Sequence, residues 1–332
     1  MTITVRSFAK INLGLRIGAR REDGFHELLT VYQTIALHDM IRVSVGRGSG
    51  IEIQCSDARV PKDGSNTCYR IVEKTMRALR ANGRVTVEIE KRLPVQGGLG
   101  GASANAVAAL LGLERALKKS LAAEDRLRIA AEVGSDVPLF LVGGTALGVG
   151  RGEQVYPLED LPATACVVVT PEVGVSTPNA FGEWDRRTGG AGAALAKSGA
   201  AKLTVAGASD RMVELGRELS AWLSESYSGA PRQKFRRGRA ENPLLELVRA
   251  GIKNDFEEVV FPEYPELSEG KSALERAGAK YASLSGSGSA LYGLFASKEA
   301  ARVAAERLRK QGWAAQATVT LTRREYWKRI FD

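Results

Sequence analysis

The sequence predicts an α+β fold in two domains, and three observations lead to this prediction. The chain has 332 residues, enough for two domains that each bury a core. Segments with strict apolar alternation, typical of half-buried strands, are interleaved with segments whose apolar residues follow helical spacing. The stretch 157–162 carries two prolines and separates the strands and helices expected before it from those expected after it. We therefore expect domains at residues 1–159 and 160–332.

The individual elements follow from the same periodicities. In the first domain we expect strands at residues 3–16, 41–45 and 85–89, and helices at 67–81, 102–118 and 122–133. In the second domain we expect strands at 166–170, 281–284 and 290–295, a helix that ends over 273–279, and a closing helix at 298–311.

Composition is that of a globular protein, with 44% hydrophobic and 26% charged residues. The first ten residues lack the apolar core of a secretory signal, so we expect a cytoplasmic protein. The longest apolar run, 137–150, is too short and too rich in glycine to span a membrane. Three scattered cysteines and two histidines disfavour a disulfide framework and a zinc site. The net charge of +9 permits either nucleic acid or an acidic small molecule as partner.

The segment between residues 184 and 241 departs from the pattern of its neighbours. Residues 188–201 are rich in glycine and alanine, and residues 212–223 have the spacing of an amphipathic helix. Residues 233–240 are dense in arginine and lysine. These cations would suit a polyanion, but a solvated loop has the same composition, and we assign no chemistry to them.

Residues 94–106, PVQGGLGGASANA, form the most informative stretch of the chain. Four glycines and a serine stand directly before an apolar helical segment, so backbone N–H groups and a helix N-terminus can face one ligand. The stretch matches neither the lysine-bearing phosphate loop nor G-x-G-x-x-G, because Ser103 occupies the last glycine position of the latter motif. It predicts a phosphate site, although a tight turn with a helix cap would use similar residues.

Three further motifs accompany this loop: AKINL at 9–13, GSDVPLF at 134–140 and LSGSGSA at 284–290. Together and in this order the four motifs resemble those of the GHMP small-molecule kinases, over residues 9–295 except 183–240. The resemblance implies an N-terminal ribosomal-protein-S5-like domain and a C-terminal ferredoxin-like domain. The segment 183–240 would then be an insertion in the second domain.

The resemblance also implies a role for each motif. The ATP phosphates would be bound by Pro94, Gly97, Gly98, Leu99, Gly100, Gly101, Ala102, Ser103 and Ala104. Asp136 would take the proton of the acceptor hydroxyl, and Lys10 would lie between that carboxylate and the transferred phosphate. Taken without the other motifs, Lys10 and Asp136 are more typical of a surface ion pair or a capped turn than of a catalytic site.

The stretch 20–32, RREDGFHELLTVY, resembles an element of those members whose acceptor carries a cytidine diphosphate. Phe25 and Phe181 would then stack on the cytosine from its two sides, and His26 would bond the edge of the base. Asn12 would bond the acceptor near its reacting hydroxyl. The alternatives are that these are core or turn residues, or that the chain phosphorylates another alcohol such as homoserine or mevalonate.

The loop departs from the family pattern at Gln96, Ala102 and Ala104, where glycine or serine is usual, and Asn105 replaces a commoner aspartate. A second serine hydroxyl is therefore missing for the Mg²⁺ that accompanies ATP, and Ser103 is the candidate ligand. We expect a monomer or homodimer whose partners are ATP and a small-molecule substrate, with no association with a membrane. A third hypothesis is a basic nucleic-acid-binding protein, but this hypothesis gives the four motifs no function.

Overall fold

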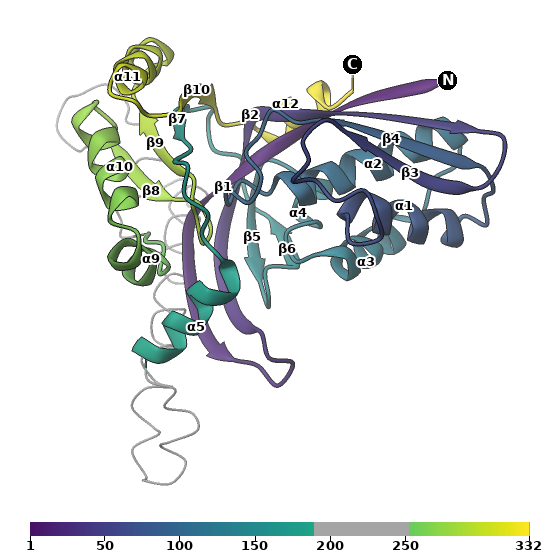
Figure 1. Cartoon of the computed structure of the whole chain (residues 1–332), viewed down its shortest axis with the longest axis horizontal. Helices are drawn as coiled ribbons and strands as arrows, with labels where there is room; N and C mark the ends of the chain where they lie inside the picture. The colour runs from purple at the N-terminus through teal and green to yellow at the C-terminus, as the bar shows by residue number, and fades with distance from the viewer. Residues whose placement is uncertain (189–251, 332) are drawn as a thin grey trace, which may run out of the picture.

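A computed structural model describes residues 1–188 and 252–331, and Figure 1 shows their arrangement around two β-sheets. The predicted helix at 212–223, the basic stretch 233–240 and nearly all of the glycine- and alanine-rich stretch lie outside these residues.

The first sheet has six strands in the order β3-β4-β2-β5-β6, with β1 paired to β2. All pairs are antiparallel except β3 with β4. The strands are β1 (Thr2–Arg20), β2 (His26–Gly46), β3 (Gly50–Cys55), β4 (Arg84–Glu90), β5 (Thr145–Val149) and β6 (Gln154–Pro157). The helices of this part of the chain are α1 (Thr67–Ala78), α2 (Gly101–Leu117), α3 (Ala123–Val133) and α4 (Leu139–Val142).

The second sheet has four antiparallel strands in the order β10-β7-β9-β8. These are β7 (Ala165–Val169), β8 (Tyr281–Leu284), β9 (Leu291–Phe295) and β10 (Ala315–Val319). The helices of this part of the chain are α5 (Thr177–Arg187), α9 (Glu257–Glu263), α10 (Pro265–Arg276) and α11 (Lys298–Lys310).

Strand β1 lies between two bodies, the first built on the six-stranded sheet and the second on the four-stranded sheet, and it contributes side chains to the cores of both. Every residue from Ser7 to Gly18 is buried, because both faces of the strand are covered. Val5 and Phe8 belong to the core beneath α2, whereas Ile11 and Leu13 share a second core with Val168 of β7. A strand covered on both faces loses the alternation of a half-exposed strand, and the long apolar character of this segment follows from that position.

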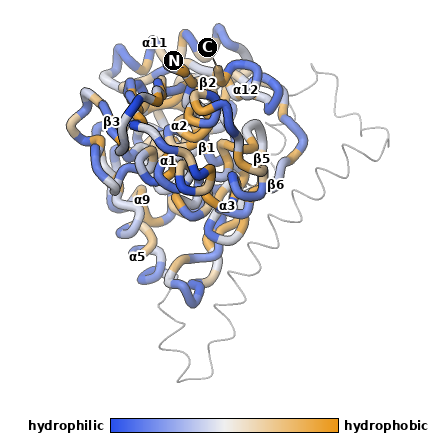
Figure 2. Tube along the Cα trace, turned by 90° about the vertical axis from the view of Figure 1, so that its right-hand side faces the viewer, coloured by the Kyte–Doolittle hydropathy of each residue, from blue (hydrophilic) through white to orange (hydrophobic). Residues whose placement is uncertain are grey.

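The last helix, α12 (Arg323–Arg329), returns to the first sheet. Tyr326 and Ile330 lie in the core of the first body, and the Tyr326 hydroxyl donates to the carbonyl of Phe140 at 2.7 Å. Phe331 pairs with Val5 in an antiparallel bridge, so the two ends of the chain lie together, as Figure 2 shows from a second side.

The expected α+β class is confirmed, and most predicted elements agree with observed ones within a few residues. Two expectations are wrong. The helix at 298–311 does not close the chain, because β10 and α12 follow it. The strand expected at 41–45 is only the last part of β2, which begins at His26. The domain boundary at 159 and 160 stays a prediction.

Candidate active site

The glycine-rich loop connects β4 to α2 and turns sharply before the helix. Gln96, Gly98 and Gly100 have positive φ angles of 60°, 73° and 70°. Gly100 is the N-cap of α2, and no side chain in the described part of the protein caps the N-terminus of this helix. The N–H groups of the first turn are therefore left for an anion, and the helix dipole adds partial positive charge at the same point. The predicted phosphate loop thus has the backbone that an anion site needs.

The loop that contains residues 285–289 packs directly against the glycine-rich loop. The Ser285 hydroxyl donates to the carbonyl of Gly98 at 2.9 Å, and the Ala290 amide donates to the carbonyl of Gly97 at 3.0 Å. A Cβ on Gly98 would lie 2.2 Å from the Ser285 carbonyl oxygen. Only glycine allows the two backbones to come this close, so Gly98 and Ser285, 187 residues apart in sequence, belong to one wall.

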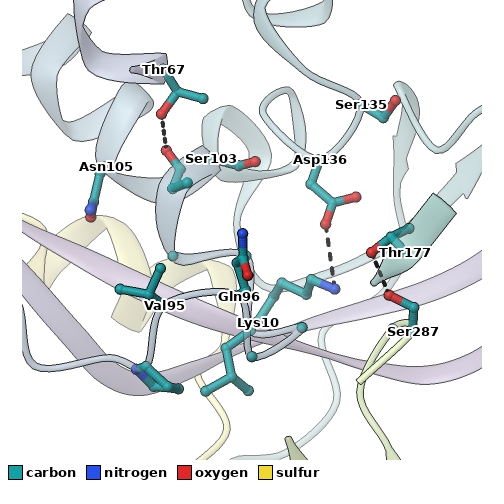
Figure 3. A pocket seen from close by; sticks show the side chains of 18 of the residues that line it. Lys10, Thr67, Val95, Gln96, Ser103, Asn105, Ser135, Asp136, Thr177 and Ser287 are labelled. Atoms are coloured by element: carbon teal, nitrogen blue, oxygen red, sulfur yellow. Dashed lines mark hydrogen bonds and ion pairs between the residues drawn. The ribbon is translucent and has the colours of Figure 1, made fainter. Parts of the chain in front are cut away.

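Lys10 and Asp136 meet beside this wall, as Figure 3 shows. The Lys10 ammonium lies 3.4 Å from the Asp136 carboxylate and donates to the Asn12 side-chain oxygen at 2.6 Å. The Lys10 side chain is 4% exposed, and that of Asp136 is 32% exposed, so the carboxylate remains open to the cleft. The Lys10 amide also donates to the Leu99 carbonyl at 3.0 Å, which fixes the strand to the phosphate loop.

The second oxygen of Asp136 has its own partner. The Tyr32 hydroxyl donates to Asp136 Oδ1 at 2.9 Å from a ring that is buried in β2. Burial, and next the Asp136 carboxylate, raise the pKa of Tyr32 well above its usual value of 10. Tyr32 therefore keeps its proton and acts only as a donor here, which orients the carboxylate with Oδ2 toward Lys10.

A second lysine-and-aspartate pair lies at the entrance to the glycine-rich loop. Asp39, fully buried, accepts from the amides of Arg92 and Leu93 at 2.7 and 2.8 Å and pairs with the Lys91 ammonium. A Cβ on Gly101 would lie 3.4 Å from Lys91 Nζ, so this cation reaches the first turn of α2. Lys91 thus adds positive charge where phosphate is expected.

The other end of the cleft is aromatic. The His26 ring stacks on Phe181 with centroids 4.9 Å apart and planes 8° from parallel, and Phe181 packs edge-to-face on Phe256. Phe25 is 50% exposed and lies 4.8 Å from the Arg151 guanidinium. The structure therefore brings His26 and Phe181 together, while Phe25 packs against the Arg151 guanidinium and, among the described residues, against no second ring.

One cavity of about 590 Å³ joins the two ends, a volume that suits small-molecule ligands. Its charged lining residues within the described chain are Lys10, Arg59, Lys91, Arg151 and Asp136. Three of these cations, Lys91, Arg59 and Arg151, pair with the carboxylates of Asp39, Asp57 and Glu153, so the lining offers cationic hydrogen-bond donors to an anionic ligand without a large net charge. Arg59 is itself paired with Asp57, and their hydrogen bonds lower the pKa of Asp57 to about 2.

Most of the predicted site residues line this cavity. They are Lys10, Asn12, Phe25, His26, Pro94, Gly97, Gly98, Leu99, Gly100, Gly101, Ala102, Ser103, Asp136 and Phe181. Ala104 does not line it, because its methyl group is 2% exposed and lies in the core under α2. The Asn12 amide is 2% exposed and already bonds Lys10 and Thr30. Its contact with an acceptor stays a prediction, as do the roles of the other residues.

Sequence reasoning missed Tyr32, Lys91, Thr177, Ser287 and Asp185. The Thr177 and Ser287 hydroxyls lie 2.7 Å apart on the cavity wall and come from different segments of the chain (Figure 3). Tyr32 and Ser287 stand inside the stretches 20–32 and 284–290, but nothing along the chain indicates that they face Asp136 and Thr177. Asp185 is the exception, because it stands four residues after Phe181 on one helix, and that spacing places both on one face.

The class to which the fold and this site belong is the GHMP kinases. Residues 66–144 match the model of the GHMP kinases N terminal domain, and residues 235–313 match that of the GHMP kinases C terminal domain. Solved structures of a homoserine kinase from Cytophaga hutchinsonii and of a mevalonate kinase share the fold at TM-scores of 0.66 and 0.63. At 18% and 12% identity, over 97% of this chain and 95% and 99% of theirs, they show the fold alone.

Within this class the chain belongs to the 4-diphosphocytidyl-2-C-methyl-D-erythritol kinase family. It is 36% identical to the kinase of that name from Solibacter usitatus, over 99% of this chain and 92% of the relative. The Moorella thermoacetica kinase of that name is 34% identical, over 93% and 95% of the two chains. A crystal structure of 4-(cytidine 5'-diphospho)-2C-methyl-D-erythritol kinase superposes with a TM-score of 0.70 at 29% identity, covering 96% of this chain and 99% of that one. The fold and family implied by the motifs are thus confirmed.

Proposed function

We propose that this chain transfers the γ-phosphoryl group of ATP to the 2-hydroxyl of 4-diphosphocytidyl-2-C-methyl-D-erythritol, a step of the non-mevalonate route to isoprenoid precursors. The observation that carries the proposal is the 3.4 Å approach of Lys10 to Asp136 beside the glycine-rich loop. The family membership supplies ATP as the donor, and the curated relatives supply the acceptor by name.

Asp136 is the base that accepts the hydroxyl proton in this reaction. The acceptor oxygen forms a bond to the γ-phosphorus while the bond to the β,γ-bridging oxygen breaks, so ADP leaves on the opposite side. An aspartate is a weak base for an alcohol, so its proton transfer comes late, when the oxygen has become acidic. Tyr32 keeps Asp136 Oδ2 directed toward Lys10, and Lys10 offsets charge on the transferred group.

The phosphates of ATP would lie on the first turn of α2, with Gly97 to Ser103 around them and Lys91 at their side. The residues present fit a Mg²⁺ held chiefly by phosphate oxygens. Within the described ranges no group of three His, Cys, Asp or Glu side chains could hold a metal alone, while the Ser103 hydroxyl lines the cavity. When bound, Mg²⁺ would neutralise charge on the phosphate oxygens.

Release of ADP from ATP and Mg²⁺ tests the proposal, with 4-diphosphocytidyl-2-C-methyl-D-erythritol, homoserine and mevalonate as separate acceptors. We expect turnover with the cytidylyl acceptor alone. The variant Asp136→Asn should lower kcat by about 10² to 10⁴ with an unchanged melting temperature, because the amide oxygen can still accept from Tyr32. Asp125→Asn, an exposed carboxylate on α3 that pairs with Arg128, is the matched control and should behave as wild type.

Turnover only with homoserine or mevalonate would refute the cytidylyl acceptor and retain the phosphoryl-transfer machinery. Full activity in Asp136→Asn would refute the machinery itself. In the described part of the chain no helix is long and apolar enough to cross a membrane. The cytoplasmic location and the monomeric or homodimeric state stay predictions.

A further inference from the structure

One helix presents two different groups to His26. Phe181 and Asp185 are four residues apart on α5 and therefore lie on the same face of that helix. Phe181 stacks on the imidazole, and Asp185 Oδ1 lies 2.7 Å from His26 Nε2. The His26 side chain is 6% exposed, so these two contacts fix a largely buried ring.

The contact with Asp185 determines which nitrogen of His26 carries hydrogen. A carboxylate can only accept, so a 2.7 Å bond requires a hydrogen on Nε2. In the neutral imidazole the other nitrogen, Nδ1, then carries a lone pair and can only accept. No residue of the described ranges bonds Nδ1, and His26 lines the cavity.

The same contacts set the plane in which a base would be recognised. A hydrogen bond to Nδ1 lies in the plane of the imidazole, and that plane is 8° from the plane of Phe181. A pyrimidine bonded to Nδ1 would therefore lie parallel to the Phe181 ring, the geometry that stacking requires. Phe181 is held in turn by Phe256, at a centroid distance of 5.0 Å.

We propose that Asp185 is a positioning residue that, by holding His26 with an accepting Nδ1, makes the cleft select a 4-amino pyrimidine over a 4-oxo pyrimidine. Cytosine offers an amino donor at position 4, whereas uracil offers a carbonyl oxygen whose lone pairs would face that of Nδ1. The inference deepens the proposed function, since it explains how the cleft reads the base of a cytidylyl acceptor. It does not depend on the chemistry at Asp136.

The variant Asp185→Asn tests this role because an amide can either accept from Nε2–H or donate to Nε2, and so no longer fixes the tautomer. Binding of CDP and of UDP is measured by titration calorimetry, with the ATP site saturated by a non-hydrolysable ATP analogue. We expect wild type to bind CDP at least about tenfold tighter than UDP, and the variant to lose about tenfold of that ratio. For the cytidylyl acceptor, KM should rise about tenfold while kcat and the KM for ATP stay the same.

Two further variants separate this role from a structural one. Glu183→Gln makes the same change on the same helix, where Glu183 pairs with Arg187 and Arg186, and it should leave the CDP/UDP ratio unchanged. In a His26→Ala background, Asp185→Asn should have no additional effect on the ratio, because Asp185 acts through His26.

A CDP/UDP ratio that Asp185→Asn leaves intact would overturn the inference, and so would an effect that persists without His26. Loss of kcat and of ATP affinity in parallel, with a lower melting temperature, would also overturn it by showing a purely structural role. The nucleotide titration needs no turnover. A chain that fails to phosphorylate the cytidylyl acceptor but shows the expected ratios would refute the proposed function and support the role of Asp185.

Discussion

Substituting Gly98 by alanine should weaken ATP-dependent turnover by a few hundredfold, because this residue lies where two loops touch. Its φ of 73° costs an alanine about 1–2 kcal/mol. The new Cβ would lie 2.2 Å from the Ser285 carbonyl oxygen and 2.8 Å from that of Gly288, whereas carbon and oxygen normally approach to about 3.3 Å. The loops must therefore separate by roughly 1 Å.

Separation breaks two hydrogen bonds, from Ser285 Oγ to Gly98 and from the Ala290 amide to Gly97. At about 1 kcal/mol each, they bring the total cost to about 3–4 kcal/mol. If the whole cost falls on transition-state binding, kcat/KM for ATP drops a few hundredfold.

The assay is steady-state kinetics at varied ATP, together with a thermal melt that detects any part of the cost paid in stability. Gly174→Ala is the control, since a Cβ there meets no atom within 4 Å and its φ is not in the left-handed region. Wild-type kcat/KM and melting temperature in Gly98→Ala would refute the close apposition of the two loops.

Two other predictions follow from groups that the structure buries. Tyr32→Phe should lower kcat about tenfold without changing the KM for ATP, because Asp136 loses a hydrogen bond that orients it. The raised pKa keeps the Tyr32 donor protonated through pH 9, so the wild-type to variant ratio of kcat should be the same from pH 6 to 9, and a ratio that falls above pH 7 would contradict this. Burial raises the pKa of the Cys68 and Cys166 thiols to about 12, so a disulfide reagent at pH 8 should label them at least about a thousandfold more slowly in folded protein than in urea. Rapid labelling of either cysteine before unfolding would show that its thiol is accessible.

Local sequence patterns predict those strands and helices that bury one face and expose the other. β4 has one face in the core and reads as an alternation, and α1 has one buried face and reads as a helix. β2 was only partly predicted, because its residues 29–35 are buried on both faces and carry no alternation. β5 lies in an apolar, glycine-rich run together with α4, and a short strand and a short helix cannot be told apart by periodicity in such a run.

The residues of the site are likewise of two kinds, those that local motifs indicate and those that only contacts distant in sequence define. Lys10, Asp136 and the glycine-rich loop stand in local motifs, so the sequence points to them, and the fold brings them together. Tyr32 and Lys91 act through partners more than 50 residues away, Asp136 and Asp39, and no spacing along the chain announces such contacts. The motif predicts a place for Ala104 at the ATP phosphates because this residue continues the glycine-rich loop, but the first turn of α2 directs its methyl group into the core.

The return of α12 to the first sheet has a consequence for biosynthesis. Leu321, Tyr326 and Ile330 are core residues of a body whose strands are all made before residue 160. A ribosome therefore completes the strands of this body long before it supplies the last three buried side chains of its core. The first body of the nascent chain must wait, partly packed, until residues 321–330 emerge, after all the strands and helices of the second sheet that precede them have been made.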